Sequence, residues 1–273
     1  WPLRMAWHVG PVDSDGDPPC LFCQSSRRAC RECSRKVCAK HAAGANGLCL
    51  QCLDDIQHAV KQGRFCTTNE EDERINGVGG PLACTYGEIT RGGFRTFARR
   101  IKLSETDRFV DLGSGLGTAV LQAAREFGCD HSLGVELGES RVQLAEAALG
   151  NESDDVASRV AFICADCADP ELWQAEPLAR VTVAFANNLL FGPELQDRLR
   201  RAVETSHSLR VFACTRPFPE DVACFRADDE GEPCRVETSW KAPDELNVVR
   251  AGGNKEEAWG SLLTIYVRSG SSE

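Results

Sequence analysis

The residues Arg108-Phe109-Val110-Asp111-Leu112-Gly113-Ser114-Gly115-Leu116-Gly117 decide the fold of this chain. The apolar run stops at Gly113, and from Gly117 to Phe127 apolar residues recur at helical spacing. This order predicts a strand, a glycine-rich turn and a helix. Glycines allow the backbone to approach a ligand closely, and a helix N-terminus directs N–H donors toward it. We therefore expect a ligand site where this strand ends.

Strand and helix patterns alternate along the rest of the chain. Strands are expected at 108–112, 132–136, 159–164, 181–186, 209–214, 235–240 and 262–268. Helices are expected at 117–127, at 140–149 with Ser140 as its cap, and from Pro193 to about Val203. Such alternation predicts a parallel sheet covered on both faces, and the consecutive strands at the end predict an antiparallel edge. The expected fold class is α/β, a doubly wound Rossmann-like sheet with a small N-terminal zinc-binding module.

Composition is that of a globular protein, with 42% hydrophobic and 26% charged residues among 273. No apolar run approaches the roughly 20 residues of a membrane-spanning helix, and the start of the chain lacks the apolar core of a secretory signal. The formal charge is +3 over residues 1–66 and −13 over residues 67–273. A nucleic-acid-binding domain is expected to be basic, so the acidic residues 67–273 do not resemble one. Their charge indicates either a basic partner or simply a solvated acidic surface.

Seven of the fifteen cysteines lie between Cys20 and Cys52, and together with His41 they form four pairs separated by two residues. Such a gap aims two soft ligands at one tetrahedral ion, and two pairs complete a structural zinc site. A segment this short needs metal to fold. We therefore predict two zinc ions, with either interleaved or sequential pairing of the ligand pairs. The candidate ligands are Cys20, Cys23, Cys30, Cys33, Cys38, His41, Cys49 and Cys52.

This module resembles the cross-braced zinc fingers, and its Arg27-Arg28-Ala29-Cys30-Arg31-Glu32-Cys33 resembles the basic stretch of lipid-binding FYVE fingers. Residues 24–40 contain six Lys or Arg and one Glu. This patch suits phosphate, DNA or phosphoinositide contact, although a solvated basic face explains it as well. The other eight cysteines are expected to be small buried hydrophobic residues.

Residues 67–85 are expected to form a connector or a mobile lid. The run Glu70-Glu71-Asp72-Glu73 is highly charged, and Gly77-Val78-Gly79-Gly80-Pro81 is expected to break any regular element.

Acidic residues at three successive strand ends indicate which ligand the glycine loop binds. Glu136 ends the second strand, 25 residues after Asp111, where it can accept hydrogen bonds from ribose hydroxyls. Asp166, at the end of the third strand, can accept one from an adenine amino group. Asp111 would repel a pyrophosphate but suits a cationic amino group, and Thr118 replaces the last glycine of a dinucleotide loop. S-adenosylmethionine combines ribose, adenine and an ammonium without phosphate, so the pattern predicts this cofactor.

Three segments resemble the disruptor-of-telomeric-silencing family of histone lysine methyltransferases. They are Tyr86-Gly87-Glu88, Phe109-Val110-Asp111-Leu112-Gly113-Ser114-Gly115 and Asn187-Asn188-Leu189-Leu190-Phe191-Gly192-Pro193-Glu194. The resemblance covers about residues 84–215 and implies a class I methyltransferase sheet. Cys167 and Leu189 stand where the family usually has aromatic residues, and Thr118 stands where it has glutamine.

The resemblance also implies roles for individual residues. Tyr86 and Glu88 belong to a loop that closes over the methionine end of the cofactor. Asp111, Gly113 and Gly115 hold its amino-acid part, Glu136 its ribose, and Asp166 with Cys167 its adenine. Asn187 lies beside the transferred methyl group and Phe191 walls the lysine channel, to which Trp240 or Trp259 adds a further wall.

The chain is accordingly divided into an unassigned segment 1–18, the zinc module 19–66, a connector with lid and helical segment 67–105, and a methyltransferase domain 106–273. A nucleosomal core histone is the expected methyl acceptor, which implies a nuclear protein. Two alternatives remain open: a methyltransferase with another protein or small-molecule acceptor, which would be cytoplasmic, and an inactive zinc-finger adaptor.

Overall fold

The computed structural model describes residues 63, 66–228, 232–236, 238–239 and 261–269, together with four two-residue strands nearer the N-terminus. The chain divides into two compact units, residues 1–57 with 254–257 and residues 58–253 with 258–273. None of the helices within the described part is long and apolar enough to cross a membrane.

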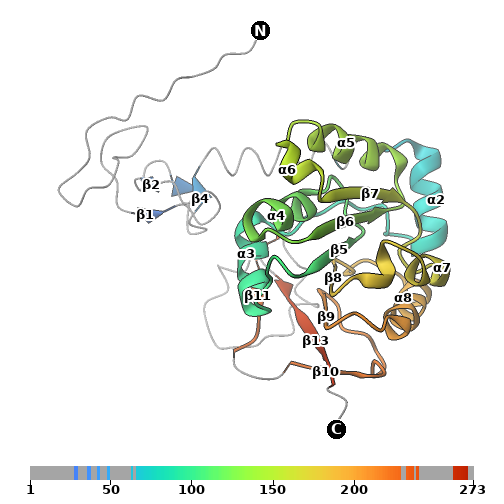
Figure 1. Ribbon diagram of the computed structural model, residues 1–273. Coiled ribbons are helices and arrows are strands. Elements are labelled where there is room, and N and C mark those ends of the chain that lie inside the picture. Colours follow the sequence, from blue (N-terminus) through green and yellow to red (C-terminus); the bar gives the residue numbers. More distant parts are fainter. Residues whose placement is uncertain are drawn as a thin grey trace, which may run out of the picture. The chain divides into compact units, whose positions relative to one another are not determined.

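A seven-stranded sheet forms the centre of the second unit (Figure 1). Its strands are, in spatial order, β10 (Phe225–Ala227), β13 (Thr264–Arg268), β9 (Val211–Cys214), β8 (Val183–Ala186), β5 (Arg108–Leu112), β6 (His131–Glu136) and β7 (Val160–Cys164). The five strands from β9 to β7 are parallel, whereas β13 runs antiparallel to both β9 and β10. This confirms the expected doubly wound sheet and its antiparallel edge.

Helices cover both faces of this sheet. Their bounds are α2 (Asn69–Gly79), α3 (Arg91–Arg100), α4 (Thr118–Phe127), α5 (Glu139–Leu149), α6 (Asp154–Ala157), α7 (Pro170–Gln174), the 3-10 helix η2 (Leu178–Arg180) and α8 (Pro193–Thr205). The five parallel strands, with the reversed β13 inserted before the edge strand β10, have the topology of a Rossmann-like class I methyltransferase.

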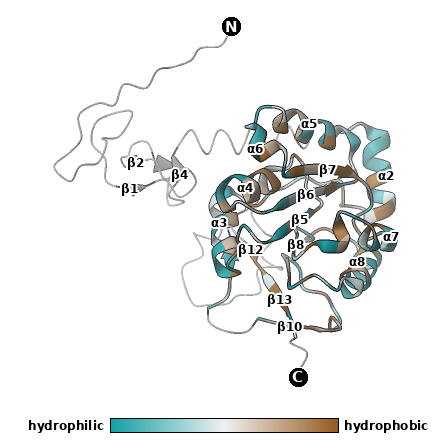
Figure 2. Cartoon of the chain, viewed as in Figure 1, coloured by the Kyte–Doolittle hydropathy of each residue, from teal (hydrophilic) through white to brown (hydrophobic). Residues whose placement is uncertain are grey.

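The two hydrophobic cores follow from the alternation of side chains along buried strands. Phe109 of β5 packs with Phe94 and Phe97 of α3 on one face, whereas Val110 points to the other face, where it packs with residues such as Trp173. Both sets are apolar because both faces are covered. Figure 2 shows the result as hydrophobic colour along strands such as β7 and hydrophilic colour over much of α8.

The expected connector at 67–85 is wrong in part, because residues 69–79 form α2. Thr68 and Glu71 make a reciprocal capping box, in which the Thr68 side chain accepts from the Glu71 backbone N–H. The charge run places acids in the first helical turn, where they complement the positive helix end. The glycines end this helix instead of preventing it.

The cap expected for α5 is also wrong. Its N-cap is Gly138, and Ser140 lies inside the helix. Glu71 of α2 accepts hydrogen bonds from Ser140 N (2.9 Å) and Ser140 Oγ (2.6 Å), so a carboxylate from another helix replaces the local cap.

Among the described residues of the strand expected at 235–240, Arg235–Val236 form β11, which pairs with β12 (Ser261–Leu262) outside the main sheet. Thr238 adds an isolated bridge to Ile89. The short β10 was not anticipated, because its three residues alternate too briefly to give a pattern.

In the first unit, β1 (Arg28–Ala29) pairs with β2 (Lys36–Val37), and β3 (Ala42–Ala43) pairs with β4 (Leu48–Cys49). The side chains of the predicted zinc ligands lie outside the described residues. Of the eight other cysteines, Cys129, Cys167 and Cys214 are buried as expected, but Cys164 and Cys224 are exposed and the rest half-buried. The prediction that all eight cysteines are buried is therefore wrong for five of them, because a cysteine by itself does not specify a core position.

An ion pair between a buried carboxylate and a partly exposed arginine joins the starts of three neighbouring strands. Asp107, just before β5, accepts hydrogen bonds from Thr182 Oγ1 and from Nε and Nη2 of Arg210, each at 2.8 Å. Burial raises the pKa of Asp107, but these bonds outweigh it and hold the pKa below its usual value. A carboxyl group whose pKa is lowered by folding stabilises the folded state at pH values above its pKa in the unfolded chain, which is near 3.9. This stabilisation is lost as the pH falls through the pKa in the folded state.

We expect Asp107→Asn to lower the free energy of unfolding at pH 7 by about 2–3 kcal/mol, because it weakens bonds to a charged partner. Urea unfolding measures the effect, and the difference from wild type is expected to persist down to about pH 4 and to shrink as the pH falls below that value. Asp130→Asn is the control, since Asp130 is half exposed and contacts Arg108 at 3.4 Å; a loss below about 0.5 kcal/mol is expected there. Equal losses in both variants contradict the prediction.

Candidate active site at the carboxyl ends of the strands

A cavity opens where β5, β6 and β8 end, bounded on its other side by residues 75–89. The space inside it, counted out to the solvent at its mouth, is about 890 Å³. All ten site residues predicted from the sequence line it. They are Tyr86, Glu88, Asp111, Gly113, Gly115, Glu136, Asp166, Cys167, Asn187 and Phe191.

The cavity is strongly acidic, and Asp111 is its most deeply buried carboxylate. Asp111 Oδ1 has no hydrogen-bond partner. Burial raises the pKa of Asp111 well above its usual value, and the nearby Glu88 and Glu136 raise it further. A buried anion without a partner is costly, so this position favours a cationic group of a ligand.

Positive φ angles and backbone bonds shape the glycine loop. Gly113 and Gly115 have φ of 87° and 54°, a region that side chains rarely adopt. Gly113 N donates to Val135 O at 2.8 Å. Glu136 Oε2 accepts from Gly115 N and its Oε1 from Gly138 N, both at 2.9 Å. Glu136 thus fixes the loop after its own strand relative to the loop after β5.

Tyr86 and Glu88 connect the segment before α3 to this loop. The Tyr86 hydroxyl donates to Glu88 Oε1 and accepts from Leu116 N at 3.2 Å. Thr118 Oγ1 donates to Glu88 at 3.1 Å, so the threonine is bonded to the carboxylate of this segment. Burial, together with the adjacent Glu88 charge, raises the pKa of Tyr86 well above its usual value. The phenol therefore stays a hydrogen-bond donor.

Asp166 and Cys167 lie after β7. Arg198 of α8 contacts Asp166 Oδ2 at 2.6 Å, while Asp166 Oδ1 accepts from Ala168 N at 2.9 Å. Burial raises the pKa of the Cys167 thiol, which remains a small apolar wall. The indole of Trp173 donates to Cys167 O at 2.8 Å and holds this turn in place.

Asn187, directly after β8, has a fixed amide. Its Nδ2 donates to Gly87 O at 3.0 Å, and its Oδ1 accepts from Thr215 Oγ1 at 3.1 Å. Phe191 lies close to the glycine loop, since a Cβ on Gly113 would stand 3.2 Å from its Cζ. Trp240 and Trp259 lie outside the described residues.

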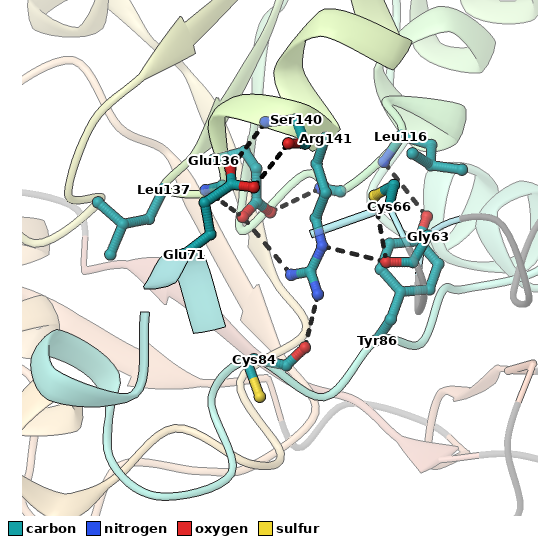
Figure 3. Close-up of polar contacts among 12 residues, drawn as sticks. Gly63, Cys66, Glu71, Cys84, Tyr86, Leu116, Glu136, Leu137, Ser140 and Arg141 are labelled. Carbon is teal, nitrogen blue, oxygen red and sulfur yellow. Dashed lines mark hydrogen bonds and ion pairs between the residues drawn. The ribbon is translucent and has the colours of Figure 1, made fainter. Parts of the chain in front are cut away.

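Arg141 also lines the cavity, although no motif or spacing in the sequence indicates it. It is the one cation among the described lining residues, and it is 4% exposed. Figure 3 shows it between Glu136 and the segment that carries Cys84 and Tyr86. An arginine in the first turns of a helix is usually solvated, and only the position of α2 and its flanking loops buries this one.

The fold and the acidic cavity define the described unit as a class I methyltransferase fold with a site for a cationic ligand. The family model described as "Histone methylation protein DOT1" matches residues 82–218, half of the chain. The chain belongs to this family.

Curated relatives carry the description "Histone-lysine N-methyltransferase, H3 lysine-79 specific". The one from Chaetomium globosum is 38% identical over 120 residues, which are 42% of this chain and 23% of that protein. The one from Drosophila melanogaster is 28% identical over 223 residues, 67% of this chain and 12% of that protein. The chain spans between 9% and 24% of the length of the first relatives.

Among solved structures, an RNA methyltransferase from Salinibacter ruber in complex with S-adenosyl-L-homocysteine is 25% identical. That match covers 44% of this chain and 72% of the other, with a TM-score of 0.37.

The burial of Asp111 gives a prediction for stability. An acid with a raised folded pKa costs stability as pH rises from its unfolded value near 3.9 toward the folded pKa. Asp111→Asn removes this cost, and we expect it to raise the free energy of unfolding at pH 7 by about 1–2 kcal/mol. Urea unfolding of the cofactor-free protein between pH 4 and 7 tests this. The gain in the free energy of unfolding over wild type is expected to increase with pH. The exposed Asp221→Asn is the control; a gain of the same size there contradicts the explanation.

Proposed function

We propose that this protein is an S-adenosylmethionine-dependent lysine methyltransferase that acts on histone H3 in the nucleosome. The observation that carries the proposal is the convergence of ten predicted residues on one acidic cavity at the strand ends. Family membership and the description shared by the relatives support the histone acceptor.

The donor set of the cavity fits the cofactor. Asp111 Oδ1 is a buried anion without a partner, which suits the ammonium of the methionine end. Gly113 and Gly115 have positive φ angles, which give the loop its shape at the cavity. Glu136 suits the ribose hydroxyls and Asp166 the adenine amino group, whereas the phosphates of a dinucleotide would be repelled by these carboxylates. The bound cofactor supplies a methyl group activated by its attachment to a sulfonium.

The residues around Asn187 orient the reacting groups and exclude water from them. The transfer itself is an in-line displacement by a neutral lysine amine. Free lysine has a pKa near 10.4, so it is almost wholly protonated at neutral pH. A channel walled by Phe191 disfavours the ammonium form by desolvation. Asn187, whose amide is held by Gly87 and Thr215, orients the reacting end, and orientation alone is worth several kcal/mol.

The charge of the chain suits this substrate. Residues 67–273 carry a formal charge of −13, which attracts basic histones. A basic segment such as residues 24–40 would then make the contacts to nucleosomal DNA. A histone acceptor places the protein in the nucleus.

Label transfer tests the proposal. The protein is incubated with methyl-labelled S-adenosylmethionine and nucleosomes, free histones or a cell extract. We expect label on histone H3 in nucleosomes and its loss when H3 lysine 79 is replaced by arginine. Label on another protein, or on a small molecule in the extract, identifies a methyltransferase with a different acceptor. No binding of cofactor by the folded protein leaves the adaptor alternative.

Gly115→Arg is expected to reduce label transfer to background. A Cβ at Gly115 stands 2.6 Å from Tyr86 Cε2, so any side chain there displaces the ring and fills the cavity. Gly77→Arg is the matched control, because no atom lies within 4 Å of a Cβ at Gly77. Transfer by the Gly115 variant at the wild-type rate contradicts the assignment of the cavity.

We further propose that the residues from Cys20 to Cys52 form a cross-braced, FYVE-like module that binds two structural zinc ions. Cys30 and Cys33 fall between the paired strands β1 and β2, an arrangement that suits a metal-binding turn. The donor set of seven cysteines and His41 matches two tetrahedral sites. The basic residues of this module suit a phosphate-bearing partner.

Cys30→Ser is expected to release one of two bound zinc ions per chain and to unfold this module, with the α/β unit intact. Elemental analysis after dialysis measures the zinc, and calorimetry with S-adenosylhomocysteine verifies the other unit. Cys224→Ser is the control, since Cys224 is exposed and outside the module. Unchanged zinc in the Cys30 variant contradicts the metal assignment.

A further inference from the structure

The ring of Tyr86 lies in a slot that has a glycine on two sides. A Cβ on Gly63 would stand 2.3 Å from Tyr86 Cζ, and a Cβ on Gly115 would stand 2.6 Å from Tyr86 Cε2. Both distances are shorter than real side chains allow, so neither position accepts a side chain while the ring stays in place. Gly115 belongs to the cofactor loop, whereas Gly63 precedes α2 and has no role in the site described so far.

Arg141 closes this slot from α5. Its Nε donates to Gly63 O at 3.3 Å and its Nη2 to Cys84 O at 2.5 Å. Its guanidinium carbon lies 5.2 Å from the centroid of the Tyr86 ring, within the range of a cation–π interaction. One side chain thus holds the segment before α2, the segment after it and the ring between them, as Figure 3 shows.

The same guanidinium also faces the acidic cavity. Arg141 Nη1 lies 3.7 Å from Glu136 Oε1, and Glu136 in turn accepts from Gly115 N. The positive charge is therefore balanced inside the site, although it is nearly fully buried. A lysine has one compact charge and lacks the planar fork, so it cannot bond both carbonyls and face the ring in this way.

We propose that Arg141 and Gly63 are positioning residues that hold Tyr86, and with it residues 84–88, over the cavity before the cofactor binds. The inference rests on the proposed function, in which Tyr86 and Glu88 close over the methionine end of the cofactor. Neither residue has to touch the reacting atoms. A segment ordered in advance spares the ligand the entropic cost of ordering it, which increases affinity.

Tyrosine resonances test the positioning without any cofactor. The chain has two tyrosines, Tyr86 and Tyr266. In protein labelled with 3-fluorotyrosine, the ¹⁹F spectrum therefore has two signals, assigned with Tyr266→Phe. Gly63→Ala is expected to shift or split the Tyr86 signal and to leave that of Tyr266, whereas the control Gly77→Ala leaves both. A Tyr86 signal that is unmoved in Gly63→Ala overturns the proposal.

Cofactor affinity provides the second test. Arg141→Met is expected to raise the dissociation constant of S-adenosylhomocysteine, measured by calorimetry, and the KM for the methyl donor by about tenfold. The kcat is expected to change less than about threefold, because the reacting atoms are untouched. Arg141→Lys keeps the charge beside Glu136 and is expected to recover part of the affinity.

Arg74→Met is the matched control, since Arg74 bonds Leu137 O at 2.9 Å but does not line the cavity. Its dissociation constant is expected to stay within about twofold of wild type. Wild-type affinity in Arg141→Met overturns the proposal. Melting temperatures identify variants that fail to fold; if Arg141→Met is one, Arg141→Lys and Gly63→Ala carry the test.

The two proposals fail separately. If the wild-type protein binds no S-adenosylhomocysteine while Gly63→Ala still moves the Tyr86 signal, the proposed function is wrong and the positioning stands. If the wild type binds the compound and no Arg141 or Gly63 variant changes its affinity, the positioning is wrong and the proposed function stands.

Discussion

The described unit is organised around negative charge concentrated where parallel strands end. Asp111 and Glu136 lie at the carboxyl ends of the neighbouring strands β5 and β6, and Glu88 lines the same cavity from the segment before α3. Burial, followed by repulsion from Glu88 and Glu136, raises the pKa of Asp111, so its ionised form carries an unfavourable electrostatic free energy in the folded protein. The sheet fixes the backbone of Asp111 and Glu136. Hydrogen bonds from Gly115 N and Gly138 N fix the side chain of Glu136, and one from Thr118 Oγ1 fixes that of Glu88.

This arrangement explains the chemistry that the cavity favours. A ligand with an ammonium and a sulfonium relieves the repulsion, whereas a pyrophosphate adds to it. The buried Arg141 offsets part of the charge without filling the cavity, because two of its donors are bonded to backbone carbonyls. Arg141 therefore contributes both to the charge balance of the cavity and to the placement of the segment over it.

The helix α2 connects the edge of the site to the sheet. Glu71 caps its own helix and also accepts from Ser140 in α5, so one carboxylate joins two helices that are distant in sequence. Gly192 N donates to Gly79 O at 2.6 Å, which attaches the end of α2 to the turn before α8. The segment over the cavity thus has anchors on both sides of the site.

Local patterns in the sequence determined the central strands, the glycine loop and the helices that follow it, because buried strands and amphipathic helices have distinct periodicities. They also located Asp111, Glu136 and Asp166, since the carboxyl ends of parallel strands meet at one edge of a sheet. What only the tertiary structure decided involves pairs far apart in the chain. Arg141 is buried because α2 and its flanking loops cover it, Gly63 is constrained by the ring of Tyr86, and Ser140 is bonded to a carboxylate 69 residues away. No periodicity or spacing encodes such contacts, because they depend on how separate elements pack against one another.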